Sequence, residues 1–135
     1  MAFRSLSVVC FAGVALVLGA CRSVQPAPAP VPVAGNVASE SYRLGTYSAE
    51  FNSTLFNVDK AVRAACRRAK LIEKSRINRG NTCTYQFKDV DENTLQIVLN
   101  EKDGVVKIAL RIGRTGDRAS SQTLLAAIAE ELALL

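Results

Sequence analysis

Apolar residues recur at every second position in several segments of the chain, a pattern typical of strands with one buried face. The clearest case is 82–88, where Cys83, Tyr85 and Phe87 alternate with polar residues. Similar segments span 46–51, about 70–77, 95–99 and 106–112, and 70–77 is the least regular of them. Asp103-Gly104 separates the last two and predicts a tight hairpin, because that turn needs positive φ at both central positions.

Two other segments carry apolar residues at spacings of three and four, which predicts amphipathic helices. The first runs from Leu55 to about Ala69, after a cap at Ser53 or Thr54. The second follows Asp117, a good N-cap, and its apolar stripe consists of Leu124, Ile128, Leu132 and Leu135. The predicted order is β-α-β-β-β-β-α. An antiparallel sheet of about five strands with both helices on one face would bury every stripe, so we expect an α+β two-layer sandwich.

The N-terminus carries a different pattern, a mostly apolar run from Leu6 to Leu18 behind Arg4. A positive start, a short apolar region and small residues at its end are typical of a signal peptide. About 13 residues are too few to cross the roughly 30 Å of a bilayer's hydrocarbon core, which needs about 20. We therefore expect residues 1–20 to be a signal peptide that is removed.

Leu18-Gly19-Ala20-Cys21 closes this run and resembles the lipobox of bacterial lipoproteins, in which Leu, a small residue, and Ala or Gly precede a Cys. The resemblance implies cleavage before Cys21, a diacylglycerol on its thiol and acylation of the new amino group. Two or three acyl chains hold a protein on a membrane without a spanning segment. An ordinary secreted protein with an accidental cysteine is the alternative. In such lipoproteins Asp after the Cys causes inner-membrane retention; Arg22 stands here, which favours the outer membrane, facing the periplasm.

Residues 21–44 have the composition of a tether between the anchor and the folded domain. Pro26, Pro28, Pro30 and Pro32 alternate with Ala and Val, and Gly, Asn and Ser follow. Proline favours extended backbone and lacks the donor that helix and sheet need. We expect a passive spacer here, which holds a domain of residues 45–135 clear of the membrane.

The composition narrows the function classes. The chain has no histidine, and so lacks the commonest general base and metal ligand. Its net charge falls from +5 to about +4 when Arg4 is removed, which favours anionic surfaces such as lipid headgroups or wall polymers. The compartment argues against nucleic acid. Ser120-Ser121 lacks a catalytic partner, so we expect no enzyme, no metal and no cofactor beyond the covalent lipid on Cys21.

Cys66 and Cys83 remain once Cys10 leaves with the signal peptide and Cys21 is lipidated. Cys66 lies on the buried stripe of the first helix, and Cys83 lies on the inward face of a strand. An oxidising compartment permits a disulfide between them. The alternative is two buried thiols that act as small apolar groups.

A dense basic run spans the end of the first helix and the following strand. Its members are Arg63, Arg67, Arg68, Lys70, Lys74, Arg76 and Arg79. This run is a candidate patch for anionic lipid or wall polymer, at about 1 kcal/mol per basic residue near a charged surface. The simpler interpretation, which we favour, is the solvated face of a helix and an edge strand.

Ala109-Leu110-Arg111-Ile112-Gly113, followed by Gly116-Asp117 and a helix with serines, is similar to part of a family of small bacterial lipoproteins of unknown function. Members share an Ile-Arg-Val-Gly-x-x-Gly-Asp-like stretch before the C-terminal helix, and the resemblance covers roughly 45–131. It supports the fold and the lipid anchor and implies no activity. The segment 113–117 could cradle an anion at the helix start, or serve as a strand-to-helix turn with an Asp cap.

These patterns together predict a lipid-anchored cell-envelope protein whose domain is a non-catalytic structural or interaction module. The expected partner is another envelope protein, a wall polymer or anionic lipid. The alternative is a periplasmic domain that binds a small molecule or an anion in the space between helices and sheet.

Overall fold

The computed structural model describes residues 37–135 of the chain. They form elements in the order β-β-α-β-β-β-β-α. The strands are β1 (Val37–Arg43), β2 (Thr46–Phe51), β3 (Ile72–Arg79), β4 (Thr82–Lys88), β5 (Thr94–Lys102) and β6 (Val105–Ile112). The helices are α1 (Leu55–Arg68) and α2 (Arg118–Ala133).

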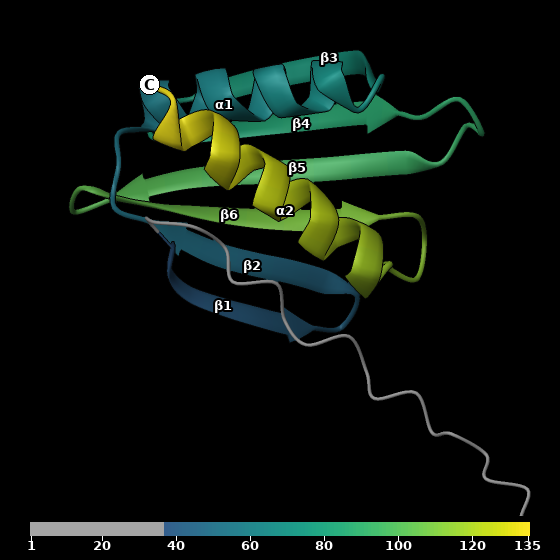
Figure 1. Cartoon of the computed structure of the whole chain (residues 1–135), viewed down its shortest axis with the longest axis horizontal. Helices are drawn as coiled ribbons and strands as arrows, with labels where there is room; N and C mark the ends of the chain where they lie inside the picture. The colour runs from purple at the N-terminus through teal and green to yellow at the C-terminus, as the bar shows by residue number, and fades with distance from the viewer. Residues whose placement is uncertain (1–36) are drawn as a thin grey trace, which may run out of the picture.

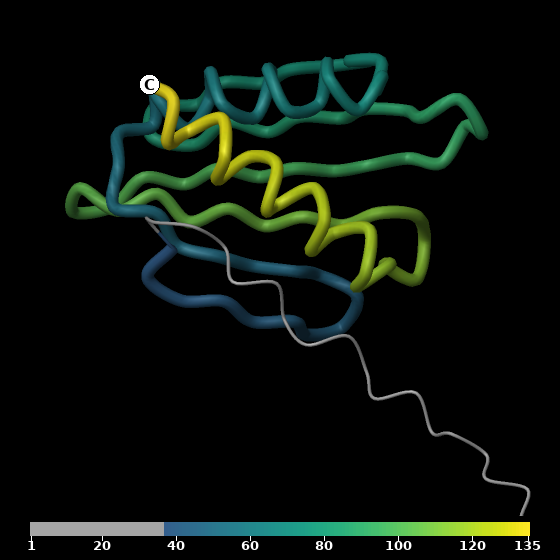
Figure 2. Tube along the Cα trace, viewed as in Figure 1, coloured from purple at the N-terminus to yellow at the C-terminus, as the bar shows by residue number. Residues whose placement is uncertain are grey.

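The strands form a single sheet in the order β1-β2-β6-β5-β4-β3, and all neighbours are antiparallel. Both helices lie on the same face of this sheet (Figure 1). The Cα trace shows α1 running along the β3–β4 side and α2 crossing the middle strands obliquely (Figure 2). The predicted α+β two-layer sandwich is confirmed.

Strand β1 corrects the prediction, because Val37–Arg43 was expected to belong to the tether of residues 21–44. The described part of the sheet therefore has six strands instead of about five, and the fold begins before Gly45. Only Val37 and Tyr42 are partly buried in β1, so this edge strand has no apolar alternation that would reveal it. The predicted signal peptide, the lipobox-like segment that ends at Cys21 and the prolines lie outside the described residues.

The β1–β2 turn is held against the loop that leads into α2. Gly45 and Gly116 have φ of +78° and +81°, and a Cβ on either would overlap the backbone of the opposite loop. Arg118 at the start of α2 places its guanidinium 5.6 Å from the centre of the Tyr42 ring. These contacts tie β1 to the rest of the domain.

Both helices begin at the predicted caps. Thr54 Oγ1 accepts a hydrogen bond from Asn57 N at 3.3 Å, and the Asp117 carboxylate accepts one from Ser120 N at 3.2 Å. Ser120 Oγ also donates to Asp117 at 2.7 Å. The carboxylate of Asp117 thus occupies the N-terminus of α2, which supports the structural interpretation of residues 113–117 over an anion cradle.

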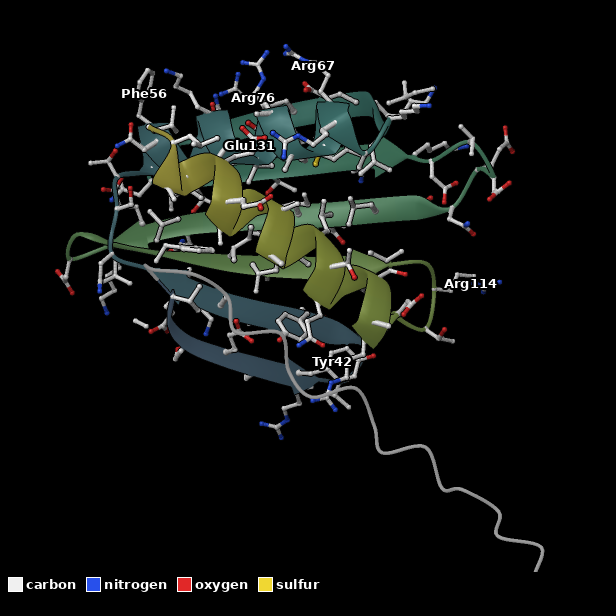
Figure 3. All side chains as sticks on the ribbon, viewed as in Figure 1. Tyr42, Phe56, Arg67, Arg76, Arg114 and Glu131 are labelled. Atoms are coloured by element: carbon white, nitrogen blue, oxygen red, sulfur yellow. The ribbon has the colours of Figure 1, made fainter. Side chains whose placement is uncertain are left out.

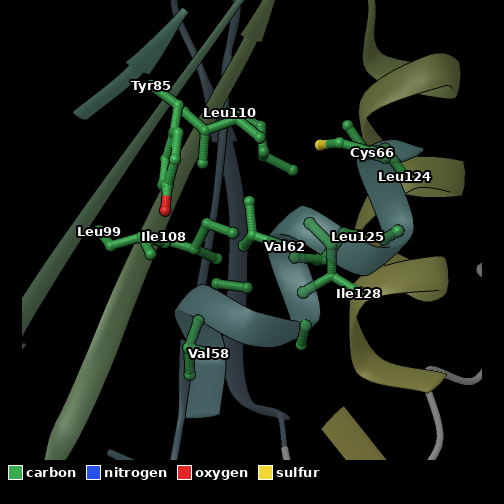
Figure 4. Close-up of a cluster of buried hydrophobic side chains, with 14 of the residues drawn as sticks. Val58, Val62, Cys66, Tyr85, Leu99, Ile108, Leu110, Leu124, Leu125 and Ile128 are labelled. Atoms are coloured by element: carbon green, nitrogen blue, oxygen red, sulfur yellow. The ribbon is translucent and has the colours of Figure 1, made fainter. Parts of the chain in front are cut away.

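The core fills the space between the helices and the near face of the sheet (Figure 4). Inward-facing residues pair across the strands, as in Tyr47 with Leu110, and Ile108 with Leu99. The predicted helix stripes are buried at Val58, Val62, Ala65, Cys66, Leu124, Ile128 and Leu132, whereas Ala69 and Leu135 at the helix ends are exposed.

Candidate functional site

The Asp59 carboxylate on α1 is a charged group inside this core, with 8% of the residue exposed. It accepts hydrogen bonds from Arg76 Nη2 at 3.0 Å and from the Tyr85 hydroxyl. Arg76 and Tyr85 are opposite residues on β3 and β4, so both point toward the helix layer. The guanidinium carbon of Arg76 lies 5.5 Å from the centre of the Tyr85 ring. This Asp59 cluster joins α1 to two strands.

A hollow of about 420 Å³ opens beside the cluster, between α1 and the β3–β4 end of the sheet. Asp59, Arg76 and Cys83 line its inner wall, and Phe56, whose side chain is 70% exposed, stands at its rim. Figure 3 shows Phe56 and Arg76 on this side of the molecule. The polar groups of the wall bind each other, because the Asp59 carboxylate accepts hydrogen bonds from both the Arg76 guanidinium and the Tyr85 hydroxyl. The arrangement fits a structural anchor better than a reaction centre.

Both cysteines of the domain are free, buried thiols, and the candidate disulfide between Cys66 and Cys83 is not formed. Cys83 Sγ lies 4.0 Å from Asp59 Oδ1, beside the first half of α1. Cys66 is seven residues further along that helix, a rise of about 10.5 Å. A disulfide needs Cα atoms within about 7 Å of each other. The two thiols therefore share the helix–sheet layer but lie at different heights along α1.

The electrostatics of these thiols make them weak nucleophiles. Burial raises the pKa of the Cys66 thiol to about 12, and the nearby Glu73 carboxylate adds to this. Burial also raises the pKa of Cys83, although the hydrogen bond to Arg76 opposes the shift. Because the thiolate is the reactive form, little of either thiol is reactive at neutral pH.

The predicted basic run does not form one patch in the structure. Arg63 and Arg67 are exposed on the outer face of α1, where Lys60 joins them around a shallow hollow. Figure 3 shows Arg67 at this outer edge. Arg68 instead pairs with Glu131 and, at 3.6 Å, with Glu130 of α2.

The remaining members of the run also separate. Arg76 pairs with Asp59 in the helix layer, whereas Arg79 is opposite Thr82 and so points to the other face of the sheet. Lys70 is exposed in the turn after α1, with φ of +58°, and Lys74 is exposed at an irregularity in the β3 pairing. The alternation of the strand sends neighbours in sequence to opposite faces.

The face of the sheet away from the helices, here called the open face, was not among the candidate sites from sequence. Its residues are half-buried or exposed, and its long charged side chains are mostly basic. They are Arg43, Arg79, Lys88, Lys102, Lys107 and Arg111, against Glu50. The ion pairs among residues 37–135 use Arg68 and Arg76 as their cations, so these open-face cations have no ion-pair partner there.

A second hollow, of about 420 Å³, lies between α2 and the helix-covered face of the sheet, where β5 begins and β6 ends. Leu71, Leu95, Ile112 and Leu124 give it an apolar lining, and Ser120 and Thr123 contribute hydroxyl groups. This α2 groove is the space that the sequence-based alternative, a small-molecule site, would require.

Within residues 37–135 no group of His, Cys, Asp and Glu side chains is arranged to hold a metal ion. No helix of this described part has the length and apolar character needed to cross a membrane.

Fold and surfaces together define a small α+β domain in which one face of the sheet is covered by helices and the other is open. Residues 4–131 match the family described as "Protein of unknown function (DUF3568)". The match covers most of the chain, and the chain belongs to this family. No curated protein matches it.

Proposed function

We propose that this chain is a lipid-anchored protein of the bacterial cell envelope whose α+β domain binds a partner without catalysis. The anchor is the lipid on Cys21, within the lipobox-like Leu18–Cys21 segment. The family match begins at residue 4, so the matched region includes this segment. Arg22, in place of Asp, favours the outer membrane on its periplasmic side.

The proposal that the domain is a binding module rests on the open face of the sheet. A sheet of six strands with both helices on one face leaves the other face as a broad surface of polar and basic side chains. The interior offers little chemistry in comparison, since Asp59 is engaged by its two donors and the thiols have raised pKa values. A binding role follows from where the accessible polar groups lie.

Expression of the full chain in a double-membraned bacterium tests the anchor. We expect membrane-bound protein whose mass equals residues 21–135 plus a diacylglyceryl group and, after amino acylation, a third acyl chain. Cys21→Ser should abolish both cleavage and lipidation, whereas Cys10→Ser, within the same N-terminal segment, should change neither. Soluble periplasmic protein with an unmodified Cys21 would overturn the proposal.

The α2 groove supports a second candidate function, the binding of a small apolar molecule. Its volume of about 420 Å³ and its lining of Leu71, Leu95, Ile112 and Leu124 suit a short acyl chain or a similar group. Dodecanoate titrated into residues 22–135 is the test. Saturable binding that Ala127→Phe removes would support this function, and absence of binding to the unsubstituted protein would exclude a fatty-acid site.

A further inference from the structure

A line of short side chains crosses the open face at right angles to the strands. Following the pairing from β1 to β3, the line reads Ser41, Ser48, Ala109, Val98, Thr84 and Ile77. Its central members, from Ser48 to Thr84, are half-buried although no helix covers them. Neighbouring strands are about 4.8 Å apart, so the line is roughly 24 Å long.

On β6 and β5 longer and more exposed side chains flank this line on both sides. From β2 to β3 one flank reads Glu50, Lys107, Asn100, Thr82 and Arg79, so that one carboxylate lies opposite Lys107. The other reads Arg111, Gln96, Gln86 and Ser75, and Thr82 and Ser75 are half-buried members of the two flanks. Lys107 and Arg111 lie on the same strand with Ala109 between them, about 13 Å apart along the backbone. The short line is therefore the floor of a shallow trough, and the two flanks are its banks.

Two hollows on the same face agree with this shape. One, of about 360 Å³, is lined by Ile77, Arg79, Thr82 and Thr84 at the β3 end of the trough. The other, of about 590 Å³, lies beside the second bank and is lined by Gln96, Arg111 and the adjoining loops, which contribute Arg114 and one carboxylate, Glu92. Each hollow thus places an arginine beside amide or hydroxyl groups.

We propose that this trough binds a linear anionic polysaccharide of the envelope. The inference rests on the proposed function, since it names the partner that the module holds. The bank cations Lys107, Arg79 and Arg111 have no ion-pair partner among the described residues and outnumber the one bank carboxylate, Glu50. Arg111 donates one hydrogen bond, to the Arg114 carbonyl oxygen at 2.6 Å, and its other N–H groups remain as donors for carboxylate groups along a chain. Hydroxyl and amide side chains between them, such as Thr84 and Gln96, offer donors and acceptors for sugar hydroxyls.

The composition of the trough disfavours two other classes of partner, a protein surface and a membrane. All tyrosines of the described part and Phe51 and Phe87 point into the helix layer or pack against it, so the open face has no aromatic side chain. Protein interfaces are enriched in aromatic residues and Met, which this face lacks. Surface helices enter membranes with Trp, Phe or Leu, and the exposed Phe56 lies on α1, away from the trough.

Isothermal titration of residues 22–135 with polygalacturonate, a linear chain with one carboxylate per sugar, is the direct test. The core residues all lie between Tyr47 and Leu132, so this segment keeps every core contact described here. We expect saturable binding that weakens with added salt, and amide shifts in NMR spectra at Ser48, Val98 and Ala109. Neutral dextran and vesicles with phosphatidylglycerol should bind far more weakly.

Matched variants distinguish binding in the trough from nonspecific electrostatic attraction to the whole domain. Lys107→Gln with Arg111→Gln removes two bank cations and should weaken binding about tenfold. Lys60→Gln with Arg63→Gln removes the same charge from the outer face of α1 and should leave affinity nearly unchanged. Thr84→Gln lengthens a floor residue without changing charge and should also weaken binding.

Three outcomes would overturn the trough as a polysaccharide site: equal weakening by both charge pairs, tighter binding to vesicles than to polygalacturonate, and binding of dextran as strong as that of the acidic polymer. None of them affects the lipid anchor, which the mass of the processed chain reports independently. Failure of the trough and failure of the proposed function are thus distinguishable.

Discussion

Replacing Asp59 with alanine removes the carboxylate that joins α1 to β3 and β4. Tyr85 is fully buried, so its hydroxyl would lose its partner at a cost of about 1–3 kcal/mol. The Arg76 side chain is 33% exposed, and water therefore recovers part of the lost ion pair, which leaves a cost of about 1 kcal/mol. We expect Asp59→Ala to lower the free energy of unfolding by about 2–4 kcal/mol.

Urea unfolding followed by circular dichroism measures this loss, and a double-mutant cycle assigns it. Tyr85→Phe removes the hydroxyl that Asp59→Ala leaves without a partner. The double variant should therefore cost about 1–2 kcal/mol less than the sum of the single variants. Asp91→Ala, at an exposed turn, is the control and should stay within about 0.5 kcal/mol of the unsubstituted protein. Strict additivity, or an Asp59→Ala effect no larger than the control, would refute the buried network.

Three further outcomes follow from the structure. Gly116→Ala places a Cβ on the backbone of the β1–β2 turn and should lower the free energy of unfolding in urea by about 2–4 kcal/mol. The control Gly104→Ala, at a similar positive φ but with no atoms nearby, should lower it by about 1 kcal/mol. Equal losses in the two variants would contradict the close contact. Hydrogen bonds from Ser120 hold the pKa of Asp117 below its usual 3.8, so the stability that they provide is present above that pH and lost as pH falls through the lower folded-state pKa. Asp117→Asn should flatten the acid loss of stability below about pH 4, and an unchanged slope would argue against the cap. The Cys66 thiol, with a pKa of about 12, should react with iodoacetamide at pH 8 only on unfolding, and rapid alkylation of folded protein would show that it is accessible.

The sequence was sufficient for features that depend on local periodicity. The alternation in 82–88 and the three–four spacing from Leu55 set which faces are buried, and caps at Thr54 and Asp117 depend on residues three positions away. Strand β1 was missed because it is an edge strand, held by its pairing with β2 and by Tyr42, without an apolar face of its own.

The functional surfaces depended on long-range register, which no local pattern contains. The partners of Asp59 are 17 and 26 residues away in the chain, although an acidic residue beside Val58 on the buried stripe was a usable signal. The trough requires the pairing of all six strands, since one residue of slip in β6 would turn Ala109 inward. The disulfide prediction correctly placed both thiols between the helices and the sheet. It did not take account of the distance along α1 that separates Cys66 from Cys83.

The edge position of β1 also has a mechanical consequence. A pull on the chain before Val37 reaches the domain first at the pair Val37–Phe51 and peels β1 from β2 one residue pair at a time. Little apolar area resists this, because most of β1 is exposed, until the load arrives at Tyr42 and at the contact between Gly45 and Gly116. Seven residues can thus extend under tension while the core and most of the trough floor stay intact. Strand β1 would act as a short extensible element in series with the predicted tether, lengthening before the rest of the domain unfolds.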